Sequence, residues 1–189
     1  MDLSELSIRQ VLLAAAALAL AAGLVALLLA RAAARGTGFR ATLRGGSAVV
    51  ASDTGAGPSM VLSDPVLGIR GRPDYLLEEP GGSERVLVPV EVKPRRRSQR
   101  LYESDSVQLG AYLIATRATF GPQAADFGYV RYAEHTFRVR LTDELERRVN
   151  EIVAAVRLGR TLPRVRRTHH FAARCARCAM RTHCDEALR

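Results

Sequence analysis

The sequence predicts an α/β domain with a small mixed central β-sheet flanked by helices, preceded by one transmembrane helix. Two observations lead to this fold class. Residues 11–30 are apolar without interruption, whereas beyond residue 59 short apolar stretches between turn residues give way to helical and hairpin patterns. The length of 189 residues suits one globular domain with an appendage. The net charge of +9 predicts a surface that attracts nucleic acid or anionic lipid.

The apolar stretch at residues 11–30 contains only Val, Leu, Ala and one Gly. A helix of this length reaches about 30 Å, the thickness of a bilayer core. Arginines follow the stretch and acidic residues precede it, so the positive-inside rule predicts an inner-membrane protein with its amino terminus outside and its body cytoplasmic. The alternatives are a cleaved signal peptide, which would start with positive charge, and a core helix, which would not be apolar on every face. We predict a single-pass anchor at 1–35.

Residues 36–58 are rich in Gly, Ser and Thr and predict a flexible linker with one weak strand. The core is predicted at 59–160. Its first strands are predicted at 60–62, 66–69 and 74–77, where short apolar stretches are broken by Asp-Pro and Gly-Arg-Pro. Residues 85–92 (RVLVPVEV) are apolar on both faces and predict a central buried strand, in which Pro89 is unusual.

The second half of the core predicts a helix, a hairpin and another helix. The first helix is expected at 104–118, where a Gly-Pro pair stops it, and the hairpin joins 127–132 to 136–141. Thr142 is a suitable N-cap for the next helix, which has acidic residues in its first turn and an apolar stripe along one face. A basic tail at 161–189 follows.

Three polar residues of the core suggest metal-dependent chemistry. Glu91 and Lys93 are two positions apart on a predicted strand, so their side chains share a face, and Asp74 lies one hairpin upstream. Two neighbouring carboxylates suit Mg²⁺ or Mn²⁺, and a lysine beside them can orient a water or stabilise a phosphoryl transition state. Lys93 is also the single lysine in the chain. The simpler alternative is a surface ion pair between Glu91 and Lys93.

Four motifs occur in a characteristic order along the chain. They are Gly71-Arg72-Pro73-Asp74, Pro89-Val90-Glu91-Val92-Lys93, Gln108-Leu109-Gly110-Ala111-Tyr112, and the cysteines Cys175, Cys178 and Cys184. In this order they resemble the RecB-like branch of the PD-(D/E)XK nucleases. Within that branch the chain is most similar to the CRISPR-associated iron–sulfur exonucleases of the "Cas-four" type and to the nuclease domain of a replication helicase–nuclease.

The resemblance implies a restriction-endonuclease-like core that hydrolyses DNA. It implies that Asp74 and Glu91 are metal ligands, that Lys93 is the catalytic lysine, and that Gln108 and Tyr112 contact the DNA or support the lysine. Those families usually have a metal-binding histidine upstream of the Asp motif and a fourth cluster cysteine near the amino terminus. In this chain no histidine precedes His135, and no fourth cysteine exists.

The cysteines Cys175, Cys178 and Cys184 are odd in number and confined to the tail, which argues against a disulfide framework. Their spacing suits metal or cluster ligation, and the resemblance favours a [4Fe–4S] cluster. A Zn²⁺ site completed by a histidine, or three unligated thiols, are the alternatives.

Three arginines, Arg95, Arg96 and Arg97, follow Lys93 closely in the sequence. We predict that they contact DNA phosphates. An arginine surface facing anionic lipid is the alternative. We therefore expect a membrane-anchored DNA nuclease that acts on single strands or ends. A catalytically inactive membrane-tethered DNA-binding adaptor, or an iron–sulfur redox protein without a nucleic acid, are the competing functions.

Overall fold

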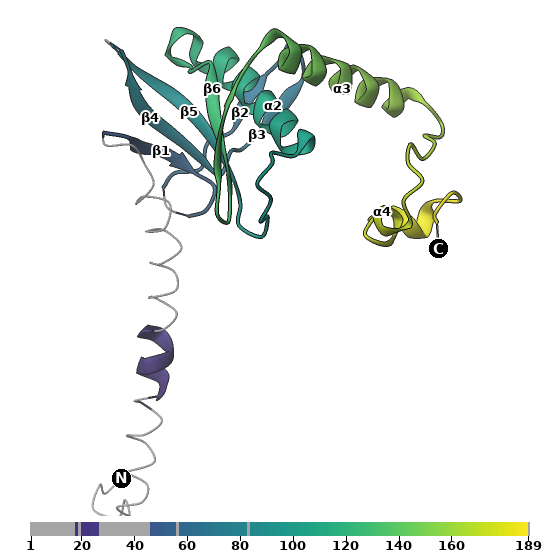
Figure 1. Ribbon diagram of the computed structural model, residues 1–189, viewed down its shortest axis with the longest axis horizontal. Coiled ribbons are helices and arrows are strands. Elements are labelled where there is room, and N and C mark those ends of the chain that lie inside the picture. Colours follow the sequence, from purple (N-terminus) through teal and green to yellow (C-terminus); the bar gives the residue numbers. More distant parts are fainter. Residues whose placement is uncertain (1–17, 19, 27–45, 56, 83, 189) are drawn as a thin grey trace, which may run out of the picture.

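The computed structural model describes residues 18, 20–26, 46–55, 57–82 and 84–188, and its core is a five-stranded sheet with helix α2 across one face (Figure 1). In spatial order the strands of this sheet are β1 (Ala48–Ser52), β4 (Tyr75–Gly81), β5 (Glu84–Lys93), β6 (Phe127–Tyr132) and β7 (Thr136–Arg140). The further elements are the β2–β3 hairpin (Leu62–Asp64 and Ile69–Gly71), α2 (Glu103–Phe120), α3 (Asp143–Thr161), α4 (Ala172–Ala176) and two 3₁₀ turns (Gly121–Gln123 and Arg181–His183).

The predicted mixed sheet is confirmed, because β5 runs parallel to β6 while the other neighbouring strands are antiparallel. The parallel register begins at Val90, directly after Pro89, which has no N–H to donate to β6. Gly128 of β6 lies beside Pro89. A Cβ added to Gly128 would lie 2.6 Å from the Pro89 carbonyl oxygen, so a residue without a side chain lets the two strands approach at the proline.

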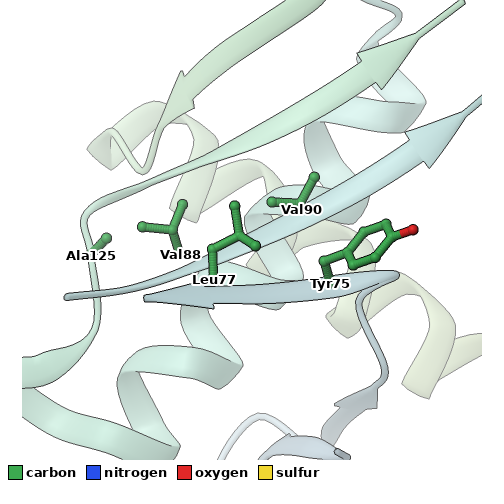
Figure 2. Close-up of a cluster of buried hydrophobic side chains, with 5 residues drawn as sticks. All are labelled: Tyr75, Leu77, Val88, Val90 and Ala125. Atoms are coloured by element: carbon green, nitrogen blue, oxygen red, sulfur yellow. The ribbon is translucent and has the colours of Figure 1, made fainter. Parts of the chain in front are cut away.

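The two faces of the sheet carry different apolar clusters. On the face under α2, Leu76 packs with Leu62 and Ala115, and Leu109 of the helix packs with Val130 of β6. The opposite face carries Tyr75, Leu77, Val88 and Val90 of β4 and β5, and Figure 2 shows them in one cluster with Ala125, which lies on the segment before β6. Because the strands are apolar on both sides, polar residues on the α2 face stand out as exceptions that need a partner or a function.

The first strands differ from the prediction in their positions. The turn at Val66 and Leu67 replaces the predicted strand at 66–69, because both backbone N–H groups donate to Asp64 Oδ1, at 2.8 and 3.0 Å. The weak strand expected in the linker is β1, and it forms an edge of the central sheet. The folded core therefore begins before residue 59.

The helices follow the sequence pattern closely. The predicted cap of α3 is confirmed, since Thr142 Oγ1 accepts a hydrogen bond from Leu145 N at 3.2 Å. Helix α3 packs on α2, and Arg157 near its carboxyl end donates to the Val66 carbonyl at 3.2 Å. The segment with α4 lies beyond the far end of α3, away from the sheet (Figure 1).

The predicted inner-membrane localisation is contradicted by the structure. In the part of the chain that is described, no helix is both long enough and apolar enough to cross a membrane. Within the predicted span, the structure describes a helical run at 20–26. The rest of the predicted span at 11–30, apart from residue 18, lies outside the described residues.

Candidate active site

The start of β4 positions the carboxylate of Asp74. This residue directly precedes β4, and the register that pairs Tyr75 with Val90 brings Asp74 beside the end of β5. Its Oδ2 accepts a hydrogen bond of 2.7 Å from the backbone N–H of Val92. The side chain of Asp74 is therefore fixed against the neighbouring strand rather than free to sample solvent.

The end of β5 contributes Glu91 and Lys93. Side chains alternate along a strand, and Val90 packs on the opposite face, so Glu91 and Lys93 share the face that α2 covers. Lys93 Nζ donates to Glu91 Oε1 at 2.6 Å, and the Glu91 side chain is only 8% exposed. The predicted placement of both residues on one face is confirmed by this contact.

Helix α2 completes the cluster with Gln108 and Tyr112, which lie one helical turn apart. Gln108 Oε1 accepts from Lys93 Nζ at 3.0 Å, while Gln108 Nε2 donates to Glu91 Oε1 at 2.9 Å and to the Tyr112 hydroxyl at 3.1 Å. This amide orientation suits the charges, because a flipped amide would place its NH₂ against the ammonium. We refer to Asp74, Glu91, Lys93, Gln108 and Tyr112 as the polar cluster.

Gly71 has a packing role beside the polar cluster. A Cβ at this position would lie 2.6 Å from Cε1 of the Tyr112 ring. The glycine of the Gly-Arg-Pro-Asp motif therefore makes room for the tyrosine of the helix, so the first and third motifs meet in space. Burial is the main cause that raises the pKa of the Tyr112 phenol, and the nearby Glu91 and Asp74 carboxylates raise it further.

Burial raises the pKa of the Glu91 carboxyl above its ordinary value of 4.5. The hydrogen bond from Lys93 opposes this rise, and the adjacent Asp74 charge adds to it. Two carboxylates that repel each other in a buried site favour a proton or a cation between them. Within the described residues, Asp74 Oδ1 and Glu91 Oε2 accept no hydrogen bond, so each carboxylate keeps one oxygen for such a cation.

The raised pKa of Glu91 predicts how pH affects the metal-free protein. Above pH 4.5 the folded state holds a proton on Glu91 that the unfolded chain has already released. The contribution of Glu91 to the free energy of unfolding is therefore full below pH 4.5 and falls as pH rises through the folded-state pKa. Denaturant unfolding in EDTA should show the wild type losing stability relative to Glu91→Gln over this window. A difference that stays constant with pH would contradict the assignment.

Comparison with known proteins identifies the family. The family model of the PD-(D/E)XK nuclease superfamily matches residues 3–185, nearly the whole chain. The chain belongs to the PD-(D/E)XK nuclease superfamily. The matched region includes the stretch that the sequence suggested to be an anchor and linker. Nucleases of this superfamily generally use divalent metals such as Mg²⁺ or Mn²⁺ and bind DNA, and the carboxylate oxygens of the polar cluster are suitable donors for such ions.

Two further comparisons add little to the superfamily assignment. A solved structure described as "Crystal structure of SSO0001" is similar at 16% sequence identity and a TM-score of 0.44, covering 81% of this chain and 68% of the other. No curated protein matches the sequence.

A buried carboxylate that sequence reasoning missed lies next to the polar cluster of this PD-(D/E)XK protein. Asp105, in the first turn of α2, is 2% exposed. Its Oδ2 accepts from the Tyr132 hydroxyl at 2.5 Å and from Arg96 Nε at 3.0 Å. Arg96 N in turn donates to the Lys93 carbonyl at 3.0 Å. The network of Arg96, Asp105 and Tyr132 therefore ties the start of α2 to the ends of β5 and β6.

The three arginines predicted to bind DNA have different surroundings. Arg95 is exposed, Arg97 is exposed and pairs with Glu134 at 3.3 Å, and Arg96 is held by Asp105. A run of arginines in a sequence does not reveal which of them has an acidic partner. The signal that could have identified Asp105 is its position one helical turn before Gln108, on the same side of α2.

The cysteine tail shows no assembled metal site. Cys175 is buried, Cys178 is exposed and Cys184 is half-buried. Among the described residues, no three His, Cys, Asp or Glu side chains come close enough together to hold a metal ion. Within the tail, the Glu186 carboxylate accepts a hydrogen bond of 2.8 Å from the backbone N–H of Arg167. The iron–sulfur cluster on these cysteines stays a prediction from the family resemblance.

Proposed function

We propose that this protein is a metal-dependent deoxyribonuclease whose active site is the polar cluster. The observation that carries the proposal is the convergence of Asp74, Glu91 and Lys93, in which each carboxylate keeps one oxygen that accepts no hydrogen bond from the described residues. The membership of the chain in a nuclease superfamily supports it. The Gln108–Tyr112 pair on α2 further supports a place in the RecB-like branch.

The residues of the polar cluster divide the chemistry between them. Asp74 and Glu91 would hold Mg²⁺ or Mn²⁺, which when bound supplies an activated water and neutralises charge on the scissile phosphate. Lys93 places its ammonium beside Glu91, where negative charge on the phosphate grows during hydrolysis. Gln108 hydrogen-bonds to both the Lys93 ammonium and the Glu91 carboxylate and so fixes their relative position. This preorganisation means that the charged groups need not rearrange when the substrate arrives.

Exposed arginines next to Lys93 support DNA as the substrate. Arg95 and Arg100 lie on the segment that joins β5 to α2, and both side chains are exposed. Arginines in such a position neutralise phosphates of a polyanion without reading its sequence. We therefore propose that the strand to be cut runs along this segment toward Lys93.

The test uses the full chain, labelled single-stranded and blunt double-stranded DNA, and Mg²⁺ or Mn²⁺. Wild type should cleave, EDTA should stop cleavage, and Asp74→Asn should lower the rate by about 10²-fold or more because one metal ligand is lost. The matched control is Asp126→Asn, which removes an equal charge from an exposed ion pair with Arg140. Equal rates in the two variants would reject the polar cluster as the active site. DNA binding without cleavage in either metal would reject the nuclease and leave a DNA-binding protein.

A further inference from the structure

Tyr102 occupies a helix-capping position for which its side chain is poorly suited. It is the N-cap of α2, yet its side chain makes no capping hydrogen bond. Ser, Thr, Asp and Asn are preferred at this position because their side chains can satisfy the free N–H groups of the first turn. Tyr102 is instead 47% exposed. A residue that breaks a local rule and exposes an aromatic ring points to a role outside folding.

The backbone of Tyr102 is anchored, and a guanidinium packs on its exposed ring. The backbone N–H of Tyr102 donates to the Tyr132 hydroxyl at 3.0 Å, and its carbonyl accepts from Asp105 N at 3.0 Å and Ser106 N at 3.1 Å. The Arg96 guanidinium lies 4.7 Å from the ring centroid, over the ring. The hydrogen bonds therefore fix the backbone of Tyr102, and the guanidinium contact favours one orientation of its ring, so less freedom is lost when a ligand binds.

The ring also lies close to the catalytic end of β5. Tyr132, whose ring centroid is 6.0 Å from that of Tyr102, is the register partner of Lys93 on the neighbouring strand. The chain between Lys93 and Tyr102 carries Arg95 and Arg100, which have no acidic partner within the described part of the chain. An exposed aromatic ring beside unpaired arginines is the combination that binds single-stranded nucleic acid, through base stacking and phosphate contacts.

We propose that Tyr102 is a stacking platform for an unpaired base of the DNA strand that enters the polar cluster, with Arg95 and Arg100 contacting its phosphates. The proposal rests on the proposed function for where the strand leads, and it adds the residue that would select an unpaired substrate. In a duplex both faces of an interior base are covered by neighbouring bases. A single strand offers a free face at every base, whereas a duplex offers one only at its ends, which makes unpaired DNA the favoured substrate.

The chain has no tryptophan, so Tyr102→Trp introduces a single fluorescent reporter at the site. In EDTA, where the proposed cleavage cannot occur, an oligodeoxythymidine of about 15 nucleotides should quench its emission as a base stacks on the indole. A blunt duplex should quench it far less. The matched control is Phe171→Trp, at an aromatic that is 64% exposed, with Arg174 5.4 Å from its centroid. Equal quenching at both positions, or none at residue 102, would overturn the proposal.

Binding affinities provide the second arm. In EDTA, Tyr102→Ser should weaken oligodeoxythymidine binding by about tenfold or more, whereas Tyr102→Phe should bind as wild type because it keeps the ring. The melting temperature of Tyr102→Ser should stay within about 2 °C of wild type, since serine can cap α2. A lower melting temperature with equal losses for single-stranded and duplex DNA would show a structural role and overturn the proposal. Because these measurements need no cleavage, failure of the nuclease assay alone would leave them standing.

Discussion

Replacing Lys93 with methionine is expected to lower the turnover number for DNA cleavage by about 10²- to 10³-fold, the range seen when one transition-state donor is removed. Methionine keeps the length of the side chain and loses its charge. The ammonium of Lys93 lies 2.6 Å from Glu91 Oε1 and 3.0 Å from Gln108 Oε1. The extra negative charge on the phosphate develops only in the transition state. Loss of the ammonium should therefore change the Michaelis constant far less than the turnover number. Steady-state cleavage of a labelled single strand measures both quantities.

The matched control for Lys93 is Arg95→Met. It removes an equal charge two residues away, from an exposed side chain, and should raise the Michaelis constant while leaving the turnover number nearly unchanged. If both variants lose activity in the same way, Lys93 acts through general electrostatic attraction and not in the transition state.

The single lysine offers an independent chemical test of the same role. Acetylation of the native protein has only Lys93 and the terminal amine as amine targets. The Lys93 side chain is 27% exposed, so the reagent can reach it. Mass spectrometry measures the fraction of Lys93 that is acetylated, and a cleavage assay measures the remaining activity. The loss of activity should be proportional to the acetylated fraction of Lys93. Full activity with Lys93 fully acetylated would contradict a role for its charge.

The polar cluster was largely predictable because its spacings are local. Two positions along a strand set Glu91 and Lys93 on one face, and four positions along a helix set Gln108 and Tyr112 on one side. These periodicities hold wherever the elements are formed. The contact between α2 and β5, which brings the amide of Gln108 between Lys93 and Glu91, depends on packing and became visible only in the structure.

The less predictable features depend on partners that are distant in sequence or on short elements. Arg96 is indistinguishable from its neighbours in the sequence until Asp105 and Tyr132 are seen beside it. The β2–β3 turn is decided by two hydrogen bonds to Asp64, which override the apolar residues that suggested a strand. The inner-membrane localisation was predicted from hydropathy and flanking charges, and no helix in the described part of the chain is long and apolar enough to cross a membrane.

The second large effect is expected at Asp105, whose nearly solvent-free carboxylate has two close donors on one oxygen and the Ser104 hydroxyl at 3.5 Å from the other. Arg96 and the Tyr132 hydroxyl both donate to the same oxygen, Oδ2. Burial raises the pKa of the Tyr132 phenol, and the hydrogen bond to Asp105 raises it further, so Tyr132 remains a donor. Removing the acceptor would leave a buried hydroxyl without its partner and release Arg96 from the turn that follows Lys93.

Asp105→Ala is therefore expected to lower the free energy of unfolding by about 3 kcal/mol, the cost of breaking a buried charged hydrogen-bond network. Asp105→Asn keeps an acceptor oxygen and should cost less. Urea unfolding followed by circular dichroism measures both variants. The control is Glu103→Ala, in the same helical turn, because its pair with Arg148 is exposed and should contribute little to stability.

The same substitution should affect catalysis through Gln108, which lies one helical turn after Asp105. If the network holds the start of α2 on β5 and β6, loosening it moves Gln108 relative to Lys93 and lowers the turnover number, and displacements of this kind can cost about 10²-fold. Asp105→Asn should recover most of the turnover number, since the contacts to Arg96 and Tyr132 can re-form. A stable Asp105→Ala protein with wild-type turnover would show that α2 is positioned by its apolar packing alone, and that the charged network contributes nothing to the alignment of the polar cluster.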